Sequence, residues 1–121
     1  MEFNQLVPML YTEQLEETIT FYTTQLGFIC LEKNEDWQWA SLSKDDVDIM
    51  LAKPNAHMPF STPTFTGSFY IKVNDVEALW KSLKDKVEIC YPIETFDWNM
   101  REFAIYDNNK YVIQFGQEVS S

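Results

Sequence analysis

Apolar and polar positions follow two different periods along this chain, and each period predicts one type of element. Apolar residues recur every three or four positions from Leu15 to Leu26 and again from Val76 to Leu83. This spacing predicts two amphipathic helices, over about 13–25 and 76–84. Elsewhere, short apolar or alternating runs are separated by turn residues, which predicts strands. The predicted strands span about 3–10, 28–33, 37–42, 47–53, 69–73, 87–91, 101–106 and 111–116.

Residues at the ends of the predicted elements support these boundaries. Thr12 can cap the first helix and Asp75 the second, because their side-chain oxygens accept hydrogen bonds from free backbone N–H groups. Gly27 follows the first helix and suits the left-handed conformation that often ends a helix. The Asp- and Asn-rich turn after Tyr106 favours a hairpin with residues at positive φ.

The order strand, helix and three strands occurs twice, which indicates an internal duplication. Leu10 corresponds to Ile71, Trp39-Ala40 to Phe103-Ala104, and Ile49-Met50-Leu51 to Ile113-Gln114-Phe115. We therefore predict an α+β fold built from two tandem βαβββ modules in a single domain over residues 1–121. Module 1 spans about 1–53, a proline-rich connector spans 54–66, and module 2 spans about 67–117.

The composition excludes several classes of function. The chain has 9 Lys and Arg against 19 Asp and Glu, a net charge of −10, whereas nucleic-acid binding needs a basic face. No basic or long apolar segment follows Met1, so we expect a cytoplasmic protein without a membrane span. The two cysteines, Cys30 and Cys90, lie in apolar runs without a CxxC pattern, and we expect reduced core thiols.

Two segments of the chain resemble a known superfamily. Phe21-Tyr22 followed by Leu26-Gly27-Phe28 is similar to the "FY…LGF" helix end of the vicinal oxygen chelate superfamily, which includes glyoxalase I, extradiol dioxygenases and bleomycin resistance proteins. The segment from Trp98 to Asp107 resembles the "WG-REFAL-DP" segment of bleomycin resistance proteins. The resemblance implies a curved, partly open mixed sheet around a concave cleft, and a homodimer with ligand clefts between subunits.

The resemblance also implies where a metal would bind. In metal-dependent members the ligands come from the first and fourth strands of each module, at positions held here by Val7, Met50, Ser68 and Gln114. Valine cannot ligate a metal and the other three are poor ligands for Ni, Zn, Fe or Mn, so we expect no metal and no other cofactor. The one histidine, His57, lies in the connector, and the chain has no nucleophile elbow. We therefore expect no catalytic residues.

Strand alternation assigns side chains to the cleft and places an aromatic cavity there. The third strand of module 1 would present Trp37 and Trp39, with Gln38, Ala40 and Leu42 behind, and that of module 2 would present Arg101 and Phe103. Aromatic faces beside carboxylates favour flat or cationic organic ligands. The candidate ligand-binding residues are Trp37, Trp39, Asp48, Met50, Ser68, Tyr70, Trp98, Arg101, Phe103 and Gln114. The acidic neighbours are Glu35, Asp36, Asp48, Glu94, Asp97 and Glu102, and the connector adds Phe60 and Phe65.

The leading hypothesis is a metal-free, homodimeric, antibiotic-binding protein that sequesters a small aromatic or cationic molecule. The alternatives are a glyoxalase- or dioxygenase-like enzyme with divergent metal ligands, and a structural dimer with a vestigial cleft. The aromatic residues could equally fill a core or a dimer interface. Arg101 could pair with an acid such as Asp97 or Glu102, or meet a ligand carboxylate.

Overall fold

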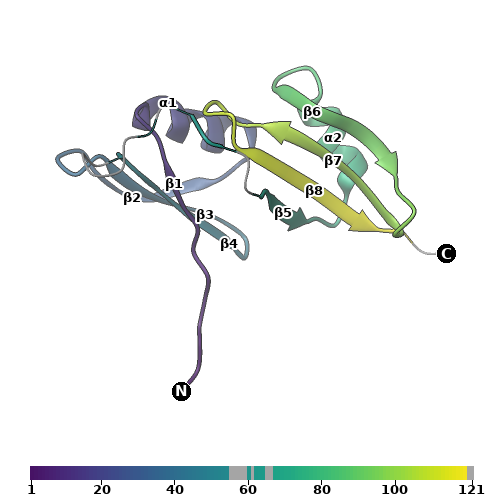
Figure 1. Ribbon diagram of the computed structural model, residues 1–121, viewed down its shortest axis with the longest axis horizontal. Coiled ribbons are helices and arrows are strands. Elements are labelled where there is room, and N and C mark those ends of the chain that lie inside the picture. The colour runs from purple at the N-terminus through teal and green to yellow at the C-terminus, as the bar shows by residue number, and fades with distance from the viewer. Residues whose placement is uncertain (55–59, 61, 65–66, 120–121) are drawn as a thin grey trace. The chain divides into compact units, whose positions relative to one another are not determined.

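A computed structural model describes residues 1–54, 60, 62–64 and 67–119. It divides into two compact units, Met1–Ser61 and Thr62–Ser121, each of which is described by itself (Figure 1). The first contains β1 (Met9–Tyr11), α1 (Leu15–Thr20), η1 (Phe21–Gln25), β2 (Ile29–Asn34), β3 (Trp39–Lys44) and β4 (Val47–Ala52). The second contains β5 (Phe69–Lys72), α2 (Val76–Leu83), β6 (Glu88–Thr95), β7 (Met100–Tyr106) and β8 (Val112–Glu118).

The two modules share one topology, which confirms the predicted α+β fold with two βαβββ modules. Their four-stranded sheets have the orders β1-β4-β3-β2 and β5-β8-β7-β6. In each sheet the first and last strands of the module pair in parallel, and the remaining pairs are antiparallel. The parallel pairing places the middle of the first strand beside the middle of the fourth, with Met9 opposite Met50 and Tyr70 opposite Gln114.

The first predicted helix is present, but it changes type half-way. α1 ends at Thr20 and continues as the π-helical turn η1, in which the hydroxyl of Thr23 donates to the Ile19 carbonyl at 2.8 Å. The segment from Ile19 to Thr24 holds only β-branched and aromatic residues, which are weak formers of regular α-helix. Gly27 then adopts φ +78°, as expected for the residue after a helix.

The helix starts differ from each other. Asp75 caps α2 as predicted, because its side chain accepts from the Ala78 N–H at 3.1 Å. Thr12 lies two residues before the first helix's N-cap position, Gln14, and accepts from the Gln14 N–H at 2.9 Å. The Thr12 hydroxyl therefore orders the turn that leads into the helix, and it does not cap the helix itself.

The strands keep their predicted order, with two large shifts in their ends. The first strand begins at Met9 rather than near Phe3, and the side chains of Phe3 and Leu6 are 96% and 88% exposed. The purple segment before β1 extends beyond the first sheet in Figure 1. β6 continues to Thr95, past the predicted end at Tyr91, with two irregularities in its pairing to β7. Among the described residues, no helix is both long and apolar enough to cross a bilayer.

Each module has its core between its helix and one face of its sheet. In the first module, Ala40, Leu42 and Leu51 are fully buried below α1 and η1. In the second, Trp80 of α2 packs on Phe103 of β7 with ring centroids 5.2 Å apart, and Phe103 in turn contacts Phe115. In Figure 1, α2 lies behind β6 and β7, so among the described residues of the second module no helix covers the other face of its sheet.

A candidate binding site in the second module

The face of the second sheet that α2 leaves open is organised around a buried carboxylate. Glu102 of β7 is 2% exposed, and three side chains donate hydrogen bonds to it. The Tyr70 hydroxyl and the Trp98 indole N–H reach Oε1 at 2.9 and 3.0 Å, and the Tyr91 hydroxyl reaches Oε2. The donors come from β5, from β6 and from the turn before β7, so this single carboxylate joins three separate segments.

The hydrogen bonds keep this carboxylate ionised. Burial raises the pKa of Glu102, but the bonds from Tyr91, Trp98 and Tyr70 outweigh burial and hold the pKa below its ordinary value. Burial, and then the bond to Glu102, raise the pKa of both Tyr70 and Tyr91 to about 12. At neutral pH, Glu102 is therefore an acceptor only and both phenols keep their protons.

The hydrogen-bond chain continues from Tyr91 to the first and last strands of the module. The Gln114 carboxamide of β8 donates to the Tyr91 oxygen at 2.8 Å, and the Ser68 hydroxyl donates to Gln114 Oε1. Ser68 and Gln114 occupy the two positions of this module at which the resemblance places metal ligands. Here the two side chains are hydrogen-bonded to each other, and Tyr91 connects Gln114 to Glu102.

Three residues of this hydrogen-bond chain, Ser68, Tyr91 and Gln114, line a pocket of about 760 Å³. Its walls include the aromatic side chains of Tyr91, Tyr106 and Tyr111, and its polar lining includes Ser68, Gln114 and Lys110. No Asp or Glu among the described residues lines the pocket. Lys110 has φ +77° and forms an ion pair with Glu88, so its charge is already partly balanced.

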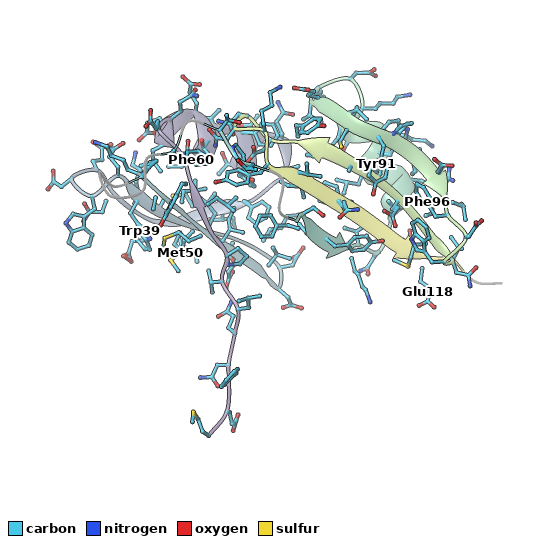
Figure 2. All side chains as sticks on the ribbon, viewed as in Figure 1. Trp39, Met50, Phe60, Tyr91, Phe96 and Glu118 are labelled. Atoms are coloured by element: carbon cyan, nitrogen blue, oxygen red, sulfur yellow. The ribbon has the colours of Figure 1, made fainter. Side chains whose placement is uncertain are left out.

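Aromatic packing supports one end of the network. The rings of Phe96 and Trp98 stack with centroids 4.8 Å apart and an interplanar angle of 8°. Tyr91 meets the same Phe96 ring edge-on at 5.8 Å, and Figure 2 shows Tyr91 and Phe96 near each other on the second module. Because Trp98 is held by this stack and by Glu102, it stays in place although 62% of it is exposed.

Gly116 makes room for the Tyr70 donor. A Cβ atom at position 116 would lie 2.0 Å from the Tyr70 hydroxyl oxygen and 2.6 Å from Cζ, far inside van der Waals contact. Gly116 pairs with Glu102 in the β7–β8 ladder, so the tyrosine crosses the glycine to reach the carboxylate. The missing side chain is therefore a requirement of the hydrogen bond from Tyr70 to Glu102.

The predicted orientation of Arg101 and Phe103 is wrong. Arg101 forms an ion pair with Glu77 of α2, and Phe103 packs against Trp80 of α2, so both lie on the helix side of the sheet. The reason is an error of one residue in relating the third strands: Ser41 pairs with Met50 and Ala104 with Gln114. The counterpart of Trp39 is therefore Glu102 rather than Phe103, and a shift of one residue moves every side chain to the opposite face.

The other candidate residues lie in the first module. Trp39 and Met50 share the face of β3 and β4 opposite the buried Ala40 and Leu51, as predicted, and Figure 2 shows them near each other. Trp37 precedes β3 and is 74% exposed. Asp48 accepts from Gln5, and hydrogen bonds from Ser43 and Gln5 hold the pKa of its carboxyl below the ordinary value.

Of the ten candidates, four meet in the second-module network: Ser68, Tyr70, Trp98 and Gln114. Phe60 of the connector packs edge-on against Tyr11 of β1, with centroids 6.3 Å apart. His57 and Phe65 lie outside the described residues. Cys30 and Cys90 are free thiols but half-buried, so the expectation of core cysteines is wrong.

The sequence interpretation missed the two central residues, Glu102 and Tyr91. Glu102 was counted among acids around the cleft, although it is almost fully buried. A signal was present: Glu102 directly precedes the apolar run Phe103-Ala104-Ile105 in a predicted strand, and a charged residue in a buried strand requires partners. No comparable signal marked Tyr91, because its role depends on the strand irregularities of β6.

The donor set does not fit a metal ion. Within the second module, the two ligand positions carry a hydroxyl and a carboxamide that bond to each other, and the first module offers Val7 and Met50. Hydroxyl, carboxamide and thioether groups without a carboxylate, imidazole or thiolate are poor ligands for the transition metals. In the part of the chain that the structure describes, no three His, Cys, Asp or Glu side chains come together as a metal site.

Comparison with known protein families identifies the superfamily of the chain. Residues 3–115 match the Glyoxalase/Bleomycin resistance protein/Dioxygenase superfamily. The chain belongs to this superfamily. No curated protein sequence matches it. Membership agrees with the two βαβββ modules, and the superfamily's name spans both enzymes and binding proteins, so membership alone leaves the activity open.

Solved structures with this fold include proteins of different kinds. TioX from Micromonospora sp. ML1 is 16% identical, with a TM-score of 0.77 over 97% of this chain and 100% of that one. The fosfomycin resistance protein FosX from Listeria monocytogenes is 11% identical, with a TM-score of 0.79 over 98% and 96%. Lactoylglutathione lyase from Agrobacterium tumefaciens is 14% identical, with a TM-score of 0.74 over 94% and 92%. At these identities the likeness concerns the superfamily fold alone.

Proposed function

We propose that this superfamily member binds an aromatic small molecule in the pocket of its second module and holds it without transforming it. The observation that carries the proposal is the hydrogen-bonded pair of Ser68 and Gln114 in the lining of a pocket that also contains three tyrosines. Pockets that bind small molecules combine apolar or aromatic walls with a few fixed polar groups, and this pocket has that composition. Its volume of about 760 Å³ falls within the range of such sites.

The lining favours a neutral aromatic ligand over a cationic one. Glu102 is not among the described residues that line the pocket, and both of its carboxylate oxygens already accept hydrogen bonds. The net charge of −10 attracts cations at long range, but it is screened over about 10 Å at ordinary ionic strength. Aromatic contact and hydrogen bonding therefore support the proposal more strongly than charge does.

Binding is tested by isothermal titration calorimetry and thermal shift with a panel of neutral and cationic aromatic compounds, bleomycin among them. We expect at least one neutral aromatic compound to bind, and Ser68→Ala to weaken it. The matched control is Ser82→Ala, because Ser82 is not among the pocket residues and its hydroxyl bonds to the Leu79 carbonyl of its own helix. A flat response across the whole panel would remove the proposal.

The same samples separate binding from catalysis. Each ligand that binds is incubated with the untagged protein alone and with Ni, Zn, Fe or Mn, and the mixture is analysed by mass spectrometry. We expect the compound to be recovered unchanged in every case. Turnover that depends on one of these metals and is lost in Gln114→Leu would replace sequestration with the enzyme hypothesis.

We also propose that the protein is a homodimer. The first module carries several strongly exposed apolar side chains, among them Phe3, Leu6, Ile29 and Leu31, and exposed apolar groups of this kind often mark an interface. Light scattering after gel filtration tests this directly. A mass of one chain, 14.3 kDa, at micromolar concentration would contradict the dimer.

A further inference from the structure

A single ionised group sets the direction of every hydrogen bond in the second-module network. The Glu102 carboxylate can only accept, so the one proton of the Tyr91 hydroxyl is committed to it. The Tyr91 oxygen can then only accept from its other neighbour, Gln114. This direction agrees with the low pKa of Glu102 and the high pKa of Tyr91.

The same reasoning fixes the orientation of the Gln114 carboxamide. Its nitrogen must face Tyr91, so its oxygen faces Ser68, and the one proton of the Ser68 hydroxyl is committed to that oxygen. Two groups remain for a ligand. The Ser68 oxygen presents only lone pairs, and the second N–H of Gln114 has no partner among the described residues.

We propose that Glu102, acting through Tyr91, fixes the polar lining of the pocket as an acceptor at Ser68 beside a donor at Gln114, and that the ligand is a planar lactam or cyclic amide. Such a molecule carries an N–H donor beside a C=O acceptor, so its N–H would meet Ser68 and its carbonyl would meet Gln114. The tyrosine walls fit a flat ring system. The proposal rests on the proposed binding function and adds the chemical class of the ligand.

Glu102 and Tyr91 are positioning residues in this scheme, because neither has to touch the ligand for the pattern to hold. The probes are 2-quinolone and coumarin, two compounds of nearly equal shape in which the lactam N–H is replaced by a ring oxygen. Coumarin would place an oxygen lone pair against the lone pairs of Ser68. We expect 2-quinolone to bind about tenfold more tightly than coumarin, the size of a lost hydrogen bond with an unpaired group.

The decisive variant is Tyr91→Phe, which keeps the aromatic ring beside Phe96 and removes the hydroxyl. Without that hydroxyl, Gln114 is free to flip and Ser68 can turn its proton toward the pocket. We expect the preference for 2-quinolone to fall to about twofold or less. Tyr22→Phe is the matched control, because Tyr22 is a buried tyrosine in the first module, and the preference should remain unchanged. If Tyr91→Phe fails to fold, Glu102→Gln replaces it with the same expected fall.

Titration calorimetry of both probes with each variant separates the outcomes. Equal binding of the two probes to the wild type would overturn the lactam assignment and leave the proposed binding function standing. Binding of other aromatic compounds but not of 2-quinolone would do the same. If the preference for 2-quinolone persists in Tyr91→Phe, the donor and acceptor positions at Gln114 and Ser68 are not set by Glu102, and that part of the proposal is overturned. Failure of every aromatic compound to bind would overturn both proposals.

Discussion

Replacing Gly116 with alanine should detach Tyr70 from Glu102. The new Cβ would lie 2.0 Å from the Tyr70 hydroxyl oxygen and 2.6 Å from Cζ, so the ring has to move. Tyr70 is 40% exposed and can swing toward solvent, which limits the cost to the hydrogen bond and some packing. A hydrogen bond to a charged group contributes about 1.5–3 kcal/mol.

The backbone change partly offsets this loss. Alanine is favoured over glycine in a regular strand by about 0.5–1 kcal/mol, because it loses less conformational freedom on folding. The net destabilisation by Gly116→Ala is therefore about 1–2 kcal/mol, which corresponds to a fall in Tm of roughly 3–8 °C for a domain of this size. Urea unfolding followed by circular dichroism measures it.

A double-mutant cycle identifies the cause. In a Tyr70→Ala background the clash is absent, so adding Gly116→Ala should be neutral or slightly stabilising. The two sites should then be coupled by about 2 kcal/mol, within the range measured for residues in contact. An equal cost in both backgrounds would show that the strand itself rejects the side chain, and the account of Gly116 as space for Tyr70 would be refuted.

Three further predictions concern other parts of the molecule. Because the pKa of Glu102 is lowered on folding, its ionised form stabilises the protein above the ordinary value of 4.5 and that contribution is lost as pH falls through the lower folded value. The stability difference between the wild type and Glu102→Gln should therefore be larger at pH 7 than at pH 3 in urea unfolding. Asp75→Ala should cost about 1 kcal/mol in the same assay, because it removes the cap of α2. Arg101→Met should cost under about 1 kcal/mol and leave ligand affinity within about twofold, because its partner Glu77 lies on the helix side; a large loss of affinity would contradict that placement.

The sequence was sufficient to predict the order of the helices and strands along the chain. The two helices were predicted from apolar residues that recur every three or four positions, a spacing that places them on one face of a helix. Asp75 caps the second helix and Gly27 follows the first with a positive φ, as predicted. The duplication followed from the repeated order of elements, and both sheets have the same strand order. Such features depend on local chemistry and on spacing, so a single sequence can specify them.

The site was harder to predict because it depends on a register that the repeat did not determine. Between the modules, the fourth strands are related by 64 residues, since Met50 and Gln114 correspond, but the third strands are related by 63, since Ser41 and Ala104 face those residues. The difference of one residue arises in the hairpin between the third and fourth strands. The apolar match of Trp39 with Phe103 concealed this difference, so Arg101 and Phe103 were predicted to lie on the wrong face of the sheet.

With the register corrected, the two modules carry opposite chemistry at equivalent positions. The strand pairing relates Met9 to Tyr70 and Met50 to Gln114, and it relates Trp39 to Glu102. Val7, two residues before Met9, likewise corresponds to Ser68. The first module is apolar at all four positions, whereas the second holds a connected set of polar groups. A hydrogen-bond network of this kind costs free energy unless every buried member is paired, so the polar groups of the second module depend on one another for their partners. This mutual dependence explains why the polar residues occur together in one module, with Glu102 as the acceptor that Tyr70, Tyr91 and Trp98 share.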